Sequence, residues 1–517
     1  MSRSRSLLAV SLIGALVATV AMVFTGPIAG DQRPEVAQRE IPLPHEVAPG
    51  MPGALLQEYA PFSPTLPDGK PMPGGWSVAV RALEPGTLDT VREREPIDLG
   101  YGGNTLVSPD GRFMAIASDY TGEVRIFDLE TWTETGKLQA EKGIRVIAWS
   151  DDGRRLVAMR DFCFSPGSEG ICPGGWLRDL WEIDVVSMAL RHVGKFDFQS
   201  HNWHFDGQNR LVALALRTDI CCGIGATEPP FVAVIDLTTG ESAGEVALPE
   251  LLMGQPKHWL GNTDLYASYS PAIVLSPDGA TAYVFESVDQ VVTSIELDEL
   301  RIVARTDLQE PRTWFSKARD SITSWFVSTA EAKGGPSYRR SAAITLDGRF
   351  LVTSGSVSLP VEKPQWQGHS DQRPAGLLVI DTTTMQVVYR EKTASDFTLS
   401  PDGRWAFATG SYFDREQLDS DGKGSEVALG LRIIDLVTLQ ETTHRWPDES
   451  IWIDAVSPDS RFVYVSVNVP PQESTRLGSD CISQCRRVSL VEVATGLVLY
   501  ERVLSSNLRI SSIASGP

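Results

Sequence analysis

The stretch Ser108-Pro109-Asp110-Gly111 is followed by the apolar run Phe113-Met114-Ala115-Ile116, and the same tetrapeptide returns at residues 276–279 and 400–403. Weaker copies stand at residues 150–153, 205–207, 346–348 and 457–460. Proline fixes φ and glycine tolerates positive φ, so each copy predicts a tight turn between two strands. The chain therefore contains seven copies of one turn, centred on Asp110, Asp152, Asp206, Asp278, Asp347, Asp402 and Asp459.

A second signal alternates with the first: an apolar strand that ends in an acid, a turn, and another strand. Its clearest copy is Val234-Ile235-Asp236-Leu237-Thr238-Thr239-Gly240. Other copies centre on Asp128, Asp184, Glu296, Asp381, Asp435 and Glu492. Each repeat thus predicts four antiparallel strands, which is the blade of an all-β β-propeller. A β-sandwich is the alternative, but it would not need the same two turns seven times.

The two ends of the domain predict a composite closing blade. Residues 76–83 and 87–94 flank a turn at 84–86 and form an extra copy of the second hairpin, while residues 508–514 repeat an innermost first strand. Closing a ring with strands from both ends removes free sheet edges. We therefore expect seven full repeats plus this composite blade, which makes eight blades. Seven blades, with the N-terminal hairpin packed outside them, is the alternative.

The Ser-Pro-Asp-Gly turn followed by an Ile-Asp-x-x-Thr-Gly hairpin resembles the YVTN and WD40-like propellers found outside the bacterial cytoplasm. The resemblance extends over roughly residues 76 to 514. It implies the fold and an extracytoplasmic location. It implies no particular activity, because such propellers include binding proteins and enzymes alike. No shared motif marks ligand residues, so none is carried over.

The N-terminus predicts a targeting element. Arg3 and Arg5 precede residues 7–24, which carry no charge. This pattern predicts a hydrophobic helix within residues 1–30 that acts as a signal anchor, or else a cleaved signal peptide, with the remaining chain outside the cytoplasm. Residues 25–75 hold 11 prolines, so residues 31–75 are interpreted as a Pro-rich linker and residues 76–517 as the propeller domain. The expected location is the cell membrane, single-pass with an extracytoplasmic propeller, or secretion.

Composition excludes two classes of protein. The hydrophobic share of 42% and charged share of 22% among 517 residues rule out wholesale disorder and a polytopic membrane protein. The formal net charge of −20 and the pI near 4.9 argue against nucleic acid as a partner.

The predicted insertions fall on one face of the propeller. In a four-stranded meander the first and third turns emerge on one side, here called the plain face. The second loops and the links between blades emerge on the other side, here called the long-loop face. Long second loops are expected at residues 162–176, 218–229, 355–375, 411–427 and 469–487, and long links at residues 249–271 and 308–338. Loops on a rigid scaffold commonly carry binding residues, although insertions also drift to wherever turns tolerate them.

Aromatic residues in or beside these insertions are the candidate binding residues. We expect Trp314, Trp325 and Trp366 to be exposed anchors. The alternative for them, and for Trp176, Trp259, Tyr266 and Tyr269, is packing of a loop onto its own blade. His201 is a further candidate because it shares a predicted innermost strand with His204. A structural histidine is the alternative at both positions.

The six cysteines, all within second loops, predict disulfides in an exported chain. They are Cys163, Cys172, Cys221, Cys222, Cys481 and Cys485. Local pairing would join 163 to 172 and 481 to 485 and leave 221–222 as a vicinal bridge, and cross-pairing between neighbouring loops is the alternative. Residues 419–422 resemble part of a calcium loop but lack its full ligand set. No metal and no cofactor are expected.

These observations favour a membrane-tethered or secreted, non-catalytic binding or scaffold module. Its partner would be a protein or small ligand on the long-loop face, and the acidic surface would steer a cationic ligand there if the charge is local. The alternative is a propeller enzyme, either a hydrolase or a quinoprotein-like oxidoreductase. The adjacent pair Cys221-Cys222 resembles the vicinal disulfide of quinoprotein alcohol dehydrogenases.

Overall fold

The computed structural model divides the chain into two units, residues 1–45 and residues 46–517. It describes residues 54–62, 75–83, 90–93, 95–100, 103–129, 131–150, 152–161, 178–217, 224–226, 228–256, 268–309, 337–360, 370–418, 424–469, 485–505 and 508–513. All described elements belong to the second unit, and all of them are β-strands. The first unit lies outside the described residues.

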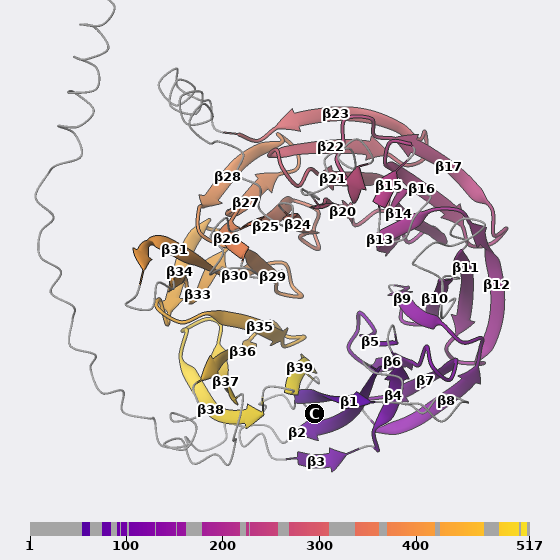
Figure 1. Ribbon diagram of the computed structural model, residues 1–517, viewed down its shortest axis with the longest axis horizontal. Helices are drawn as coiled ribbons and strands as arrows, with labels where there is room; N and C mark the ends of the chain where they lie inside the picture. The colour runs from indigo at the N-terminus through magenta and orange to yellow at the C-terminus, as the bar shows by residue number, and fades with distance from the viewer. Residues whose placement is uncertain are drawn as a thin grey trace, which may run out of the picture. The chain divides into compact units, whose positions relative to one another are not determined.

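Seven four-stranded antiparallel meanders follow one another along the chain (Figure 1), and the fifth is part of a six-stranded sheet. Blade 1 consists of β5 (Asn104–Val107), β6 (Phe113–Ala117), β7 (Glu123–Asp128) and β8 (Thr133–Gln139). Blade 2 consists of β9 (Ile144–Trp149), β10 (Arg155–Asp161), β11 (Arg178–Asp184) and β12 (Ala189–Phe196). Blade 3 consists of β13 (Gln199–Phe205), β14 (Arg210–Leu216), β16 (Phe231–Asp236) and β17 (Ser242–Ala247).

The remaining blades repeat this meander. Blade 4 consists of β20 (Ala272–Leu275), β21 (Thr281–Phe285), β22 (Val291–Glu296) and β23 (Arg301–Asp307). Blade 5 consists of β24 (Ser337–Ile344), β25 (Phe350–Pro360), β27 (Leu377–Asp381) and β28 (Gln386–Glu391). Blade 6 consists of β29 (Asp396–Leu399), β30 (Trp405–Thr409), β33 (Leu431–Asp435) and β34 (Gln440–Arg445). Blade 7 consists of β35 (Ile451–Val456), β36 (Phe462–Val469), β37 (Cys485–Glu492) and β38 (Val498–Ser505). This part of the chain is an all-β, seven-bladed propeller, and its blade count agrees with the alternative of seven.

The predicted turns form through bonds within each tetrapeptide. In blade 1 the Ser108 hydroxyl donates to Asp110 Oδ1 (2.5 Å), and the backbone N–H of Arg112 donates to the same oxygen (3.0 Å). Gly111 has φ of +72°, which only glycine adopts without strain. The same serine or threonine to aspartate bond occurs at Asp152, Asp278, Asp347, Asp402 and Asp459.

These turns also contact one another around the plain face. A Cβ built on Gly279 of blade 4 would lie 1.7 Å from the carbonyl oxygen of Asp206 in blade 3. The backbone N–H of Asp402 in blade 6 donates to the Ser460 hydroxyl in blade 7 (3.1 Å). The plain face is therefore a ring of tightly packed turns with little added chain.

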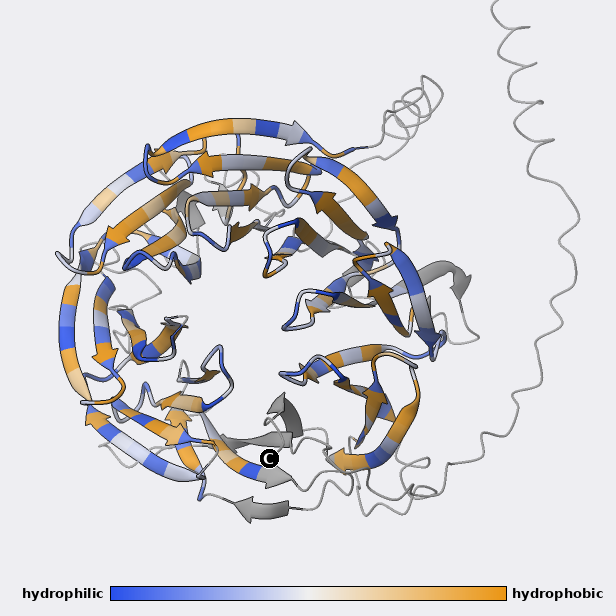
Figure 2. Cartoon of the chain, turned by 180° about the vertical axis from the view of Figure 1, so that it is seen from behind, coloured by the Kyte–Doolittle hydropathy of each residue, from blue (hydrophilic) through white to orange (hydrophobic). Residues whose placement is uncertain are grey.

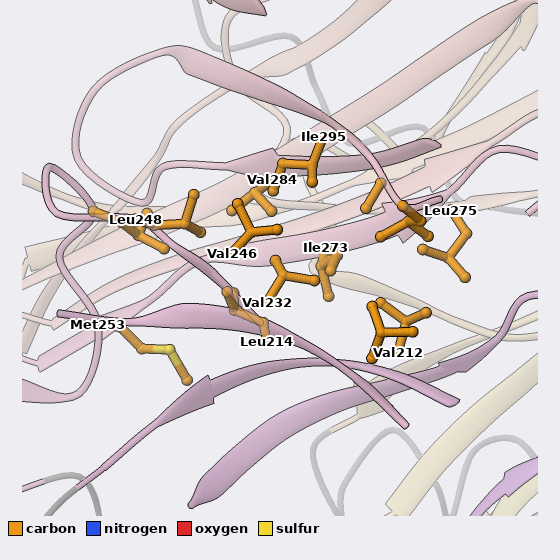
Figure 3. Packing of buried hydrophobic residues seen from close by; sticks show 14 of the residues in the cluster. Val212, Leu214, Val232, Val246, Leu248, Met253, Ile273, Leu275, Val284 and Ile295 are labelled. Atoms are coloured by element: carbon orange, nitrogen blue, oxygen red, sulfur yellow. The ribbon is translucent and has the colours of Figure 1, made fainter. Parts of the chain in front are cut away.

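The hydrophobic core lies between neighbouring blades. Second and third strands are largely buried, as in β14 and β16, whereas outer strands such as β23 are mostly exposed. Figure 2 shows hydrophilic and hydrophobic residues alternating along the strands. Figure 3 shows the seam of blades 3 and 4, where Val212 and Val232 of one blade share a buried cluster with Ile273 and Val284 of the other.

Both ends of the domain join in one further sheet, here called the terminal sheet. Its strand order is β3-β2-β1-β39, with β4 also paired to β2. These strands are β1 (Ala54–Phe62), β2 (Gly75–Leu83), β3 (Thr90–Glu93), β4 (Ile97–Gly100) and β39 (Leu508–Ile513). β39 contacts β35 of blade 7, and Val78 and Ile97 share a buried cluster with Met114 of blade 1. The N-terminal hairpin, β2 and β3, is thus joined through β1 to the C-terminal strand β39, in a sheet separate from the seven blades.

β1 corrects the interpretation of residues 31–75 as linker alone. Ala54 lies opposite both Leu83 of β2 and Ile513 of β39. The strand contains one proline, Pro61, next to its end, so the ladder keeps almost all of its donors. The rest of this predicted linker lies outside the described residues, as does the predicted hydrophobic segment at residues 7–24. Within the described residues, no helix is long and apolar enough to cross a membrane.

The long-loop face carries extra strands where the sequence predicted loops. β25 extends beyond its blade and pairs with β26 (Ser370–Pro374), and β31 (Ser411–Leu418) pairs with β32 (Gly424–Ala428). In addition, β15 (Ile224–Ala226) pairs in parallel with β18 (Gln255–Pro256). The β26 and β31 strands of neighbouring blades are in contact. Antiparallel pairing of every blade places all of these elements opposite the plain face.

Candidate binding site at the channel mouth

Most of the predicted site residues lie outside the described residues. These are Trp314, Trp325 and Trp366, five of the six cysteines and the calcium-like residues 419–422. His201 belongs to β13, but its side chain is also outside the described part. Their roles stay predictions. Cys485 is buried at the start of β37 and is disulfide-bonded, while the pairing of the other cysteines stays a prediction.

His204 fits the structural alternative. It lies on β13, and burial lowers the pKa of its imidazole, partly offset by a hydrogen bond with the backbone of Ile273 in blade 4. Asn104 joins blades 1 and 2 in a similar way, because its amide donates to the carbonyl of Val146 (2.7 Å) and accepts from its N–H (3.0 Å). Polar side chains of the innermost strands therefore fasten one blade to the next.

The long link between blades 3 and 4 reaches the channel side of blade 5. Its last part, β19 (Ser268–Ser270), pairs in parallel with β24 and adds a strand to the inner edge of that sheet. Tyr269 stacks on Tyr338 with ring centroids 5.3 Å apart and planes 6° from parallel. Pro271 follows, and the chain then enters blade 4 as β20. The link thus adds a stacked pair of tyrosines to the inner edge of blade 5.

Arg340 lies two residues after Tyr338 of this pair, at the seam between blades 4 and 5. Residues two apart on a strand share a face, so Arg340 shares its face of β24 with Tyr338. The Arg340 side chain crosses the seam, and its Nε donates to the carbonyl of Glu286 (3.3 Å). Gly355 lies opposite Arg340 on β25, and a Cβ there would lie 2.1 Å from the carbonyl oxygen of Arg339 and 3.1 Å from Arg340 Cδ. The absence of a side chain at Gly355 makes room for both the Arg339 backbone and the Arg340 side chain.

Glu286 connects several elements at the same seam. It follows β21, and its carboxylate accepts from Arg305 Nη2 of β23 (2.7 Å). Arg305 also pairs with Glu250, at the start of the long link. Burial and the nearby Asp289 and Asp307 raise the pKa of Glu286 to about 7. Groups with strongly shifted pKa values in a cleft are frequent at functional sites.

Two fully buried side-chain atoms at this seam have no hydrogen-bond partner among the described residues: Arg340 Nη1 and Ser287 Oγ. Arg340 is 8% exposed and Ser287 is 3% exposed. Comparable arginines in other blades have carboxylate partners. Arg432 pairs with Glu391 at 3.2 Å, and Arg487 lies 3.7 Å from Glu501. Burial without such a partner lowers the pKa of Arg340 to about 10.

The opposite face of β24 carries a second charged pair toward blade 6. Arg339 is exposed, and Asp396 begins the innermost strand of blade 6. Surrounding protein raises the pKa of the Asp396 carboxyl, while the charge of Arg339 acts in the opposite direction. Guanidinium groups, carboxylates and stacked phenols therefore lie together at the seams of blades 4 to 6, and Arg340, Glu286 and Tyr269 among them are buried. Within the described residues, no group of acids, cysteines and histidines is arranged to hold a metal ion.

The turns of the plain face carry acidic side chains, and steering of a cationic ligand to the long-loop face stays a prediction. The turn carboxylates are used within the turns. Hydrogen bonds from Thr345 and from the Arg349 backbone, for example, lower the pKa of Asp347. Exposed arginines stand among them, such as Arg349, which lies over the Phe350 ring at 4.6 Å. These acids are structural parts of the fold.

The comparisons with known proteins show no family for this chain. No protein-family model and no curated protein matches the chain. Among solved structures, the dihydro-heme d1 dehydrogenase NirN in complex with DHE is 14% identical, with 84% of this chain and 73% of that chain covered and a TM-score of 0.47. The β-propeller domain of Myceliophteria thermophila Cps50 (Swd1) is 13% identical, with 70% and 91% covered and a TM-score of 0.37. Kuenenia stuttgartiensis hydrazine synthase is 14% identical, with 78% and 87% covered and a TM-score of 0.32. The fold assignment rests on the sheets themselves, and these similarities assign no activity.

Proposed function

We propose that this propeller is a non-catalytic binding module whose partner docks on the long-loop face, at the channel mouth over blades 4 to 6. One observation carries the proposal: the strands added to the basic four-stranded meander all lie on this face. The plain face, in contrast, consists of short turns packed against one another. Added structure of this kind on a rigid scaffold is typical of a binding surface.

The proposal includes the extracytoplasmic setting. The uncharged segment at residues 7–24 tethers the propeller to the membrane or directs its secretion, and disulfides brace the second loops. The terminal sheet, which contacts blades 7 and 1, closes the ring. N-terminal sequencing of the mature protein checks the tether, because a free N-terminus near residue 31 indicates a cleaved signal. A propeller recovered from the cytoplasm contradicts both the tether and the export.

Paired variants on the two faces of blade 5 test the docking surface. Arg339→Glu alters the mouth, and Leu346→Asn alters a plain-face turn in which Leu346 is 72% exposed. Each folded variant is immobilised and offered the envelope fraction of its own cell, and retained molecules are compared by mass spectrometry. A partner retained by the parent chain and by Leu346→Asn, but lost by Arg339→Glu, is the expected result.

The predicted tryptophan anchors extend this test. Once a partner is known, alanine at Trp314, Trp325 or Trp366 should cost about 2 kcal/mol or more of binding free energy at a true hot spot. A partner that Leu346→Asn loses and the mouth variants keep would place docking on the plain face and overturn the proposal.

A further inference from the structure

Arg340 is a buried arginine at a blade seam that forms no ion pair within the described residues. Its one hydrogen bond within the described residues runs from Nε to the Glu286 carbonyl. Nη1 is buried and unpartnered, and Nη2 has no hydrogen bond there either. The nearby Glu286 carboxylate is bound by Arg305. A buried guanidinium without an opposite charge is costly and seldom retained without a compensating partner.

Ser287 adds a hydroxyl donor at the same place. It follows directly the peptide group whose carbonyl accepts the hydrogen bond from Arg340, and its Oγ is buried without a partner in the described part of the chain. The two buried donors without a partner thus belong to residues connected through this hydrogen bond, and Arg340 lies two residues from Tyr338 of the tyrosine stack. Guanidinium groups bind carboxylate and phosphate oxygens in a bidentate manner, and a neighbouring hydroxyl complements that geometry.

We propose that Arg340 and Ser287 form a binding site for an oxyanion, a carboxylate or phosphate group carried by the ligand of the long-loop face. That the oxyanion belongs to a ligand of the long-loop face rests on the proposed function. That an oxyanion binds here rests on the geometry of the seam. The anion supplies the missing partner for Nη1 and Nη2 and accepts from the Ser287 hydroxyl. The Glu286 carboxylate stays paired with Arg305 when the anion binds.

Small anions test the site without knowledge of the whole ligand. The melting temperature of the full chain is measured in sodium chloride and then in sodium acetate or sodium phosphate of equal ionic strength at pH 7. At about 50 mM anion and a dissociation constant near 1 mM, the parent chain should gain about 2 °C over chloride. A gain with acetate alone identifies a carboxylate site, and a gain with phosphate alone identifies a phosphate site.

Arg340→Met is the decisive variant because it removes the charge and keeps most of the volume. In chloride it should melt at the same temperature as the parent chain or higher, since an unpaired buried charge is lost. In acetate and phosphate it should lack the added gain. Arg349→Met, an exposed plain-face variant, is the matched control and should keep the gain. General salt effects on folding are shared by all three proteins.

Three outcomes overturn the proposal. The parent chain shows no gain with either anion, or Arg340→Met gains as much as the parent, or Arg340→Met is equally destabilised in all buffers. The last outcome would mean that the bond to the Glu286 carbonyl is the arginine's whole role. These failures leave docking on the long-loop face intact. Conversely, a partner that docks elsewhere would contradict the proposed function. A rise in melting temperature that depends on Arg340 and on the anion would still support the oxyanion site.

Discussion

The variant Glu286→Gln tests whether burial or the ion pair with Arg305 dominates the pKa of Glu286. Burial and the neighbouring acids raise the pKa of Glu286 from 4.5 to about 7. The folded state therefore binds this proton more tightly than the unfolded state does. The resulting stabilisation is complete below about pH 4.5 and is lost as the pH rises through about 7. Glutamine does not titrate and shows no such loss.

The size of the effect follows from linkage. At about 1.4 kcal/mol per pKa unit, the shift corresponds to about 3 kcal/mol in total. About 2 kcal/mol of this falls between roughly pH 5.5 and pH 8.5, a range that avoids precipitation near the isoelectric point. Arg305 opposes the shift, but its side chain is 42% exposed and also pairs with Glu250. Water therefore screens that ion pair, and burial dominates.

The assay is the melting temperature of both proteins across this pH range. Glu286→Gln should gain about 2 °C relative to the parent chain from the lowest to the highest pH. Glu250→Gln is the matched control, since its side chain is 66% exposed and its profile should run parallel to that of the parent. Parallel profiles for Glu286→Gln would refute the reasoning. A parent chain that gains stability with rising pH relative to the variant would show that the Arg305 pair outweighs burial.

Three further predictions concern the fold. Gly279→Ala should lower the free energy of unfolding by about 2 kcal/mol more than Gly111→Ala does. Both glycines have positive φ, but a Cβ at Gly279 would meet a neighbouring carbonyl, whereas a Cβ at Gly111 would have no atom within 4 Å. Equal losses of stability in urea unfolding would contradict the contact between the turns. Asp347→Asn should be less stable than the parent chain at pH 7 and equally stable at low pH. The pKa of Asp347 is lowered in the folded state, so its stabilising effect is present above pH 3.8 and is lost as the pH falls further. A difference in urea midpoints that stays constant across pH would contradict this. Removing residues 506–517 deletes β39 and exposes the edge of β1, so it should lower the melting temperature and promote self-association. Removing residues 514–517 should change neither the melting temperature nor the association state. Equal results for the two truncations in calorimetry and light scattering would argue against closure by β39.

The turns and blades could be predicted because their determinants are local. Ser108 and Asp110, which make the defining bond of the first turn, are two residues apart. Each of these turns is determined mainly by its own residues, and apolar runs such as residues 113–116 mark the strands beside it. The long second loops were predicted as insertions, but the hairpins β25–β26 and β31–β32 within them were not. Their polar sequences, such as residues 411–418, carry little hydrophobic alternation.

β1 shows the limit of local reading. Its sequence lies among prolines, and its partners are β2 and a strand at the far end of the chain. The nine residues of β1 contain no pattern that predicts pairing with β39, which lies at the other end of the chain.

The sequence by itself determined an all-β propeller with repeated blades, a plain face of turns and an opposite face of insertions. Only the tertiary structure decided how the ring's ends join and where the candidate site lies. Arg340 and Glu286 are 54 residues apart, and an arginine that lacks a counter-ion cannot be distinguished in sequence from one that has it. The reason is physical: turn geometry depends on backbone preferences of adjacent residues, whereas burial and charge compensation depend on which blades come together.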